Sequence, residues 1–261
     1  MPNKIDNRFA ELRKQKRKAF IPYICAGDPS LAYTVDLALA LEKSGADIIE
    51  LGLPFSDPLA DGIVNQLAAQ RALEAGATTR GVLDCVRQIR ARSTTPIVLY
   101  TYLNPILQFG WEKFHDEAES AGIDGLLILD LPPEELEGRA PSRPNLHHIR
   151  LIAPTTPPER IATVTKNARG FLYYVSREGV TGAREDISKS LGEQIAQIRK
   201  HSDLPIAVGF GISNAQQARE IAQHADAIVV GSAIVDLIAK RGTSAVEPVS
   251  AFAHEIARAI S

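Results

Sequence analysis

The chain has 261 residues, 45% of them hydrophobic and 23% charged, with a formal net charge of −2 at pH 7. This composition is typical of a globular protein with a substantial core, and the length fits one large α/β domain or two small ones. The weak net charge gives no overall attraction to nucleic acid or to an anionic membrane. Because the sequence shows neither a signal-peptide pattern nor an apolar run of transmembrane length, we expect a cytoplasmic protein.

Short apolar runs alternate with amphipathic stretches along the whole chain. Eight of these runs are predicted to be strands, at residues 20–25, 47–51, 97–101, 125–129, 148–152, 170–175, 205–208 and 227–230. Several are almost continuously apolar, which is typical of parallel strands covered on both faces. With helices between them, they predict a single (β/α)8 TIM barrel domain over residues 1–261, with an extra helix at about residues 4–17 that caps its bottom. A doubly wound sheet is the alternative, although no G-x-G-x-x-G follows the first strand.

The sequence ELGLPFSDPLADG, at residues 50–62, combines a strand end with further carboxylates. Glu50 lies at the end of a buried-looking strand, where an ionisable group is destabilising unless it has a function. Asp57 and Asp61 follow in a loop stiffened by prolines, and Asp57 alone is readily explained as a turn former. Two carboxylates in one cleft, however, provide what acid–base chemistry needs, one group that gives a proton and one that accepts it.

Barrel enzymes build their active sites from the loops at the carboxyl ends of the strands. Three of these loops contain glycine: one has Gly182, one reads GFGIS at residues 209–213, and one reads GSA at residues 231–233. Glycine lets the backbone approach an anion closely, and the Ser232 hydroxyl adds a donor. Each glycine alone is explained by a turn, but the three loops together predict a phosphate site.

Tyrosines gather at the same strand ends, at Tyr23, Tyr100, Tyr102 and Tyr173. A buried tyrosine hydroxyl needs a partner, so these residues are less readily explained as core than Leu127 is. They suggest a flat, largely apolar ligand body beside the phosphate. The histidines and cysteines show no metal-ligand spacing, so no metal site is predicted.

Over its full length the sequence resembles the α subunits of tryptophan synthase. The motifs that carry the resemblance are AGDP at 26–29, ELGLPFSDPLADG at 50–62, YTYLNPI at 100–106, LDLP at 129–132, APTTPPERI at 153–161, SREGVTGAR at 176–184, GFGIS at 209–213 and GSAIV at 231–235. The acidic motif is highly specific, whereas the glycine loops alone fit many phosphate-binding barrels.

The resemblance implies a lyase that cleaves indole-3-glycerol phosphate to indole and glyceraldehyde 3-phosphate by a retro-aldol reaction. It assigns Glu50 as general acid/base and Asp61 as the carboxylate that contacts the indole N–H. For substrate binding it assigns Tyr173 as the pocket tyrosine and Thr181 as the loop-closing threonine. Tyr23, Tyr100, Tyr102 and Leu127 are predicted to bind substrate from their positions at the strand ends. The phosphate contacts are Gly182, Phe210, Gly211, Gly231 and Ser232.

Members of that family pair with a β subunit in an α2β2 heterotetramer and pass indole to it through an internal tunnel. The resemblance therefore implies no organic cofactor in this chain and pyridoxal phosphate in the partner. The partner side would be formed by Ser56, Asp57, Pro58, Asn104 and Pro105.

The sequence departs from the family pattern after Gly62. Family members usually continue with Pro, then a residue, then Ile-Gln, whereas this chain has Ile63-Val64-Asn65-Gln66. Tyr23 and Tyr100 also stand where other members often have Phe and Leu. Two alternatives remain: another phosphate-binding barrel enzyme, and a non-catalytic protein that binds the ligand and activates a β subunit.

Overall fold

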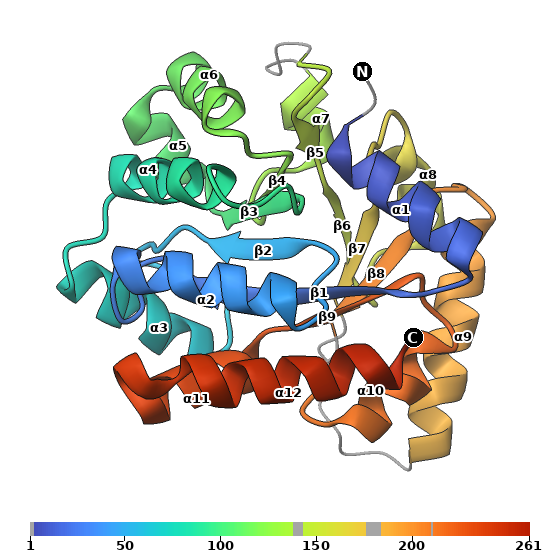
Figure 1. Cartoon of the computed structure of the whole chain (residues 1–261). Helices are drawn as coiled ribbons and strands as arrows, with labels where there is room; N and C mark the ends of the chain where they lie inside the picture. Colours follow the sequence, from blue (N-terminus) through green and yellow to red (C-terminus); the bar gives the residue numbers. More distant parts are fainter. Residues whose placement is uncertain (1–2, 138–142, 176–183, 210) are drawn as a thin grey trace.

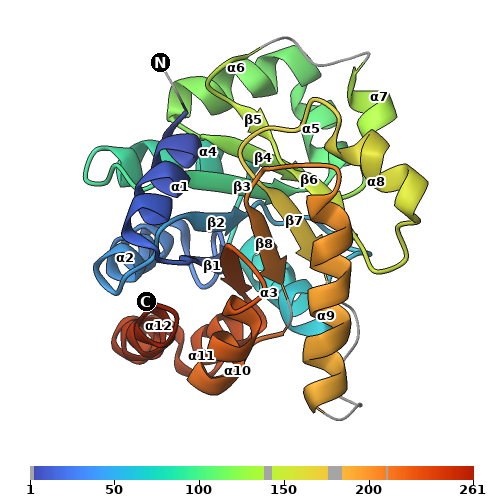
Figure 2. The ribbon, with the colours of Figure 1, turned by 90° about the vertical axis from the view of Figure 1, so that its right-hand side faces the viewer.

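The computed structural model describes residues 3–137, 143–175, 184–209 and 211–261 (Figure 1). Its strands form one sheet in which every described pairing is parallel, in the order β5-β4-β3-β2-β1-β9-β8-β7-β6. The strands are β1 (Ala19–Cys25), β2 (Ile49–Gly52), β3 (Ile97–Thr101), β4 (Gly125–Ile128), β5 (His147–His148), β6 (Arg150–Ile152), β7 (Leu172–Val175), β8 (Ile206–Gly209) and β9 (Ala227–Val230). The two ends of this order, β5 and β6, are separated in the chain only by Ile149, so the sheet closes into a barrel (Figure 2).

The predicted barrel is therefore confirmed. The strand predicted at residues 148–152 is interrupted at Ile149 and forms β5 and β6, and the other predicted strands are present with small differences at their ends. The strand predicted from residue 47 begins at Ile49, because the Asp47 carboxylate instead accepts a hydrogen bond from the backbone N–H of Phe20, 2.8 Å away. The strand predicted from residue 170 begins at Leu172, because Gly170 has a positive φ of 74° and turns the chain.

The helices surround the strands (Figures 1 and 2). They are α1 (Lys4–Gln15), α2 (Leu31–Lys43), α3 (Ile63–Glu74), α4 (Thr79–Arg90), α5 (Leu103–Phe109), α6 (Trp111–Ala121), α7 (Pro133–Glu137), α8 (Pro158–Thr165), α9 (Arg184–Arg199), α10 (Ala215–Ala222), α11 (Ser232–Arg241) and α12 (Val246–Ala259). In α4, the Thr78 hydroxyl caps the first turn, and Val82, Val86 and Ile89 bury one face in the core, the spacing expected of an amphipathic helix. Within the described residues, none of the helices is both long and apolar enough to cross a bilayer.

Helix α1 closes the bottom of the barrel, as the sequence predicts. Its residues Ile5, Phe9 and Leu12 are buried in the cluster that fills the barrel interior. The ring centroid of Phe9 lies 5.8 Å from that of Phe171, which precedes β7.

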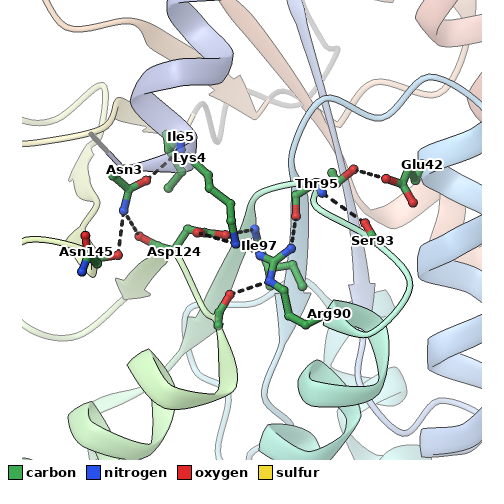
Figure 3. A network of polar contacts seen from close by, with 11 residues as sticks. Asn3, Lys4, Ile5, Glu42, Arg90, Ser93, Thr95, Ile97, Asp124 and Asn145 are labelled. Atoms are coloured by element: carbon green, nitrogen blue, oxygen red, sulfur yellow. Dashed lines mark hydrogen bonds and ion pairs between the residues drawn. The ribbon is translucent and has the colours of Figure 1, made fainter. Parts of the chain in front are cut away.

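A polar network ties α1 to the loops at this end (Figure 3). The Asn3 side-chain amide donates to the backbone carbonyls of Asp124 and Asn145, each at 2.8 Å. The Asp124 carboxylate forms an ion pair with Arg90 and accepts a hydrogen bond from the N–H of Ile97 at 2.9 Å. Burial raises the pKa of the Asp124 carboxyl, and the positive charge of Arg90 opposes that shift. The bottom of the barrel is thus fixed by paired charges and satisfied backbone groups.

Candidate active site

A cavity of about 1100 Å³ opens at the carboxyl ends of the strands. This is the end at which barrel enzymes place their active sites. The cavity brings together most of the site residues predicted from the sequence, namely Tyr23, Glu50, Asp61, Tyr100, Tyr173, Gly211, Gly231 and Ser232. Residues that the sequence analysis did not single out also line it, among them Leu59, Val64, Asn65, Leu151, Thr155 and Val229.

The other predicted residues lie elsewhere. Tyr102 is outside the cavity lining, although its hydroxyl contacts Asp61. Leu127 is fully buried in the interior cluster. The predicted partner residues lie at the surface: Ser56, Asp57 and Asn104 are exposed, and Pro58 and Pro105 are half-buried. Thr181, Gly182 and Phe210 fall outside the described residues, so their assignments stay predictions.

Glu50 is held by β2 against the wall of the cavity. In the sheet it is the Cα partner of Tyr23 on β1 and of Val98 on β3. The residue is only 1% exposed, and its Oε1 atom has no hydrogen-bond partner among the described residues. Burial, and then the negative charge of Asp61, raise the pKa of the Glu50 carboxyl to about 8. At neutral pH this side chain is therefore mostly protonated and can act as an acid.

Asp61 is oriented by two tyrosine hydroxyls. The Tyr100 hydroxyl donates to Oδ1 of Asp61 at 2.7 Å, and the Tyr102 hydroxyl donates to Oδ2 at 2.8 Å. Burial is the largest cause that raises the pKa of each phenol, to well above its usual range for Tyr100. Both hydroxyls therefore stay protonated as donors. The sequence analysis missed these bonds, in which one hydroxyl comes from β3 and the other from Tyr102, the residue between β3 and α5.

Tyrosine rings form the walls around the two carboxylates, and glycines make room for them. The rings of Tyr23 and Tyr100 meet edge to face, with centroids 5.1 Å apart. A Cβ atom at Gly52 would lie 2.4 Å from the Tyr23 hydroxyl oxygen, and one at Gly209 would lie 2.9 Å from that of Tyr173. Gly209 therefore has a packing role in addition to the loop conformation considered from the sequence.

The far side of the cavity is suited to an anion. Gly231 is the residue before α11, with no side-chain hydrogen bond to cap the helix, and Ser232 is the first residue of this helix. The first N–H groups of a helix have no partner within it and favour negative charge. Gly211 has a positive φ of 62°, and, apart from its chain neighbours, none of the described residues has an atom within 4 Å of where its Cβ would be. A phosphate can therefore approach the backbone here closely.

Comparison with known proteins agrees with this geometry. Residues 9–260 match the family model described as tryptophan synthase alpha chain. The chain is 50% identical over 238 residues to the tryptophan synthase alpha chain of Opitutus terrae, covering 90% of both chains. The chain belongs to the tryptophan synthase alpha chain family. The family predicted from the sequence motifs is thus confirmed, and with it the assignment as a lyase of tryptophan biosynthesis.

Solved structures of the tryptophan synthase alpha family superpose on the whole barrel. The subunit alpha of Legionella pneumophila has a TM-score of 0.92 and 39% identity, with coverage of 100% of this chain and 99% of that one. A chain of the tryptophan synthase α2β2 complex from Pyrococcus furiosus has a TM-score of 0.85 and 38% identity, with coverage of 92% and 98%.

Proposed function

We propose that this chain cleaves indole-3-glycerol phosphate to indole and glyceraldehyde 3-phosphate, with Glu50 as the general acid and base and Asp61 as the anion that stabilises the indole ring. The observation that carries the proposal is the pairing of a buried, protonated Glu50 with a tyrosine-bound Asp61 in one cavity. The helix N-terminus at Ser232 lies on the same cavity and is suited to the phosphate.

The reaction begins with transfer of the Glu50 proton to C3 of the indole ring. The ring then carries a positive charge at its nitrogen, and Asp61, which accepts the N–H, stabilises that charge. Glu50, now a carboxylate, takes the proton from the substrate hydroxyl on the glycerol carbon that is bonded to C3. The oxygen–hydrogen electron pair forms the aldehyde carbonyl, and the carbon–carbon bond breaks, returning its electrons to the ring. Glu50 ends protonated, as it began.

The substrate, Glu50 and Asp61 supply every proton and electron pair of these steps. The proposed reaction therefore requires neither a metal nor an organic cofactor from this chain. Pyridoxal phosphate would belong to a β subunit, which uses the released indole to make L-tryptophan.

We also propose that this β subunit docks beside the cavity mouth. Ser56, Asp57 and Asn104 are exposed there, and two large apolar side chains lie in the same loop and the helix that follows it: Leu59 is 88% exposed and Ile63 is 65% exposed. Exposed apolar side chains next to polar ones are typical of interaction sites. The α2β2 assembly of the Pyrococcus furiosus relative supports the proposal.

The test is an indole-release assay on the purified chain. We expect slow release of indole from indole-3-glycerol phosphate by the chain alone and faster release with the cognate β subunit. Asp61→Asn should nearly abolish release while the substrate still binds. If the wild type binds substrate but never cleaves it, even with the β subunit, the chain is instead a non-catalytic activator.

A further inference from the structure

The orientation of the Asp61 carboxylate depends on side chains from outside its own loop. Its two oxygens accept from Tyr100 at 2.7 Å and from Tyr102 at 2.8 Å. The Tyr102 hydroxyl also accepts from the N–H of Ala60 at 3.0 Å, so it holds the backbone of the loop as well. The Asn65 amide adds a longer contact to Oδ1, at 3.4 Å. Of the two tyrosines, Tyr100 is thus the one that binds the Asp61 carboxylate without also binding the loop backbone.

The loop itself provides little restraint on this side chain. Residues 53–62 form no helix or strand, and Leu59 within them is 88% exposed. The Asp61 backbone is held locally, by its N–H to the Pro58 carbonyl at 3.0 Å and by its carbonyl to the Gln66 amide at 2.9 Å. These backbone bonds leave the side-chain torsions free.

Tyr100, by contrast, has a position that does not depend on Asp61. It lies on β3, where it is the Cα partner of Gly52 on β2 and of Leu127 on β4. Its ring packs edge to face on Tyr23. A hydroxyl fixed by a sheet can therefore orient a carboxylate carried by a loop.

We propose that Tyr100 is a positioning residue, which holds the Asp61 carboxylate in the orientation that accepts the substrate N–H. This inference rests on the proposed function of Asp61. A carboxylate has about four lone-pair sites. Tyr100, Tyr102 and the longer Asn65 contact use three of those on Asp61, so the ring N–H can share Asp61 with Tyr100. Without the hydroxyl, Asp61 rotates on its loop, and the N–H loses its acceptor in part of the molecules.

The test combines Tyr100→Phe, which keeps the ring and removes only the hydroxyl, with Asp61→Asn. Binding of indole-3-propanol phosphate, a substrate analogue without the reactive hydroxyl, is measured for the wild type, both single variants and the double variant. A hydrogen bond to a charged group changes affinity by about tenfold. We expect Tyr100→Phe to weaken binding by about this factor when Asp61 is present and to leave it unchanged in the Asp61→Asn background.

Two other results would overturn the role. Equal weakening in both backgrounds would mean that Tyr100 contacts the ligand directly, and no weakening in either would mean that Asp61 is oriented without it. Asn65 and Tyr102, which also bind the Asp61 carboxylate, are kept unchanged in this cycle. So are Tyr23, Cys25, Glu50 and Tyr173, whose pKa values the charge of Asp61 raises. Indole release by the wild type separates the two proposals. If the wild type releases no indole, the proposed function is wrong. If it releases indole but Tyr100→Phe changes analogue binding equally, or not at all, in the two backgrounds, only the role of Tyr100 is wrong.

The matched control is Tyr33→Phe. The Tyr33 hydroxyl accepts from the N–H of Val246 at 2.9 Å and does not line the cavity. This variant loses the same atom as Tyr100→Phe, and we expect unchanged analogue binding. A thermal unfolding measurement on both variants checks that each is folded under the assay conditions.

Discussion

Carboxylates at the two ends of the barrel have different partners. At the bottom, Asp124 is paired with Arg90, and Asp47, whose side chain is 1% exposed, is paired with Arg8 at 2.5 Å. At the mouth, the buried Glu50 and the half-buried Asp61 line one cavity with tyrosines, and among the described residues neither forms an ion pair with Lys, Arg or His.

The difference separates carboxylates that stabilise the fold from carboxylates that can react. A buried carboxylate next to a guanidinium has a positive charge beside it that opposes the effect of burial on its pKa, as Arg90 does for Asp124. Glu50, buried without a cation, is mostly protonated at neutral pH and is available as an acid. The half-buried Asp61 is instead held by two hydroxyl donors. The sites at the two ends of the barrel should therefore respond differently to the removal of a charge.

The largest expected effect is on catalysis by Glu50→Gln. The amide keeps the size of the side chain but cannot transfer a proton, so turnover should fall by about 10²–10⁴-fold. The melting temperature should not fall, because no ion pair is lost. The measurement is indole release with the β subunit present, alongside calorimetry. Turnover within a factor of two of the wild type would remove Glu50 from the mechanism.

The same substitution should change the pH dependence of stability. The pKa of Glu50 is about 8 in the folded chain against an ordinary value of 4.5. Its contribution to stability is therefore fully present below about pH 4.5 and is lost as the pH rises through 8. Relative to Glu50→Gln, the wild type should lose unfolding free energy on the order of 5 kcal/mol across this range. Urea denaturation of both proteins at several pH values measures the difference, and a constant difference would contradict the raised pKa.

At the bottom, Arg90→Met should act on stability and not on chemistry. It leaves the buried Asp124 with only the partly exposed Lys4, 3.6 Å away, as a cation, which should lower the free energy of unfolding by about 3 kcal/mol, the lower end for a broken buried pair. Indole release per folded molecule should be unchanged. Arg87→Met is the matched control, because the Arg87 side chain is 38% exposed in its ion pairs with Asp84 and Glu117, and exposed pairs contribute about 1 kcal/mol or less. If the two variants lose equal free energy of unfolding, the buried Arg90–Asp124 pair stabilises the fold no more than an exposed ion pair does.

The sequence predicted the barrel well, because continuous apolar runs and helical spacing are local signals. Glu50 could be found for the same reason, since a carboxylate within an apolar run stands out. The bonds from Tyr100 and Tyr102 to Asp61 could not be found, because they require the loop after β2 to fold back over the end of β3. Sequence spacing gives no measure of such a distance, or of the fit between Gly52 and the ring of Tyr23.

One glycine at each end of the barrel gives a further comparison, with smaller expected effects. A Cβ at Gly52 would lie 2.4 Å from the Tyr23 hydroxyl and 2.9 Å from two of its ring carbons, so the ring must move. At the bottom, a Cβ at Gly125 would lie 3.0 Å from the flexible tip of Ile5. We expect Gly52→Ala to lose about 1–3 kcal/mol of stability, as overpacking does, and to slow indole release because the Tyr23 ring packs on Tyr100.

Gly125→Ala should lose less stability than Gly52→Ala and leave release per folded molecule unchanged, since the Ile5 side chain can shift without moving a cavity wall. The double variant Gly52→Ala/Tyr23→Phe tests the cause, because removing the closest atom should restore part of the lost stability. Thermal unfolding and indole release are measured on all three variants. If Gly125→Ala slowed release as much as Gly52→Ala, the two ends would be coupled, and the division between a stabilising bottom and a reactive mouth would fail.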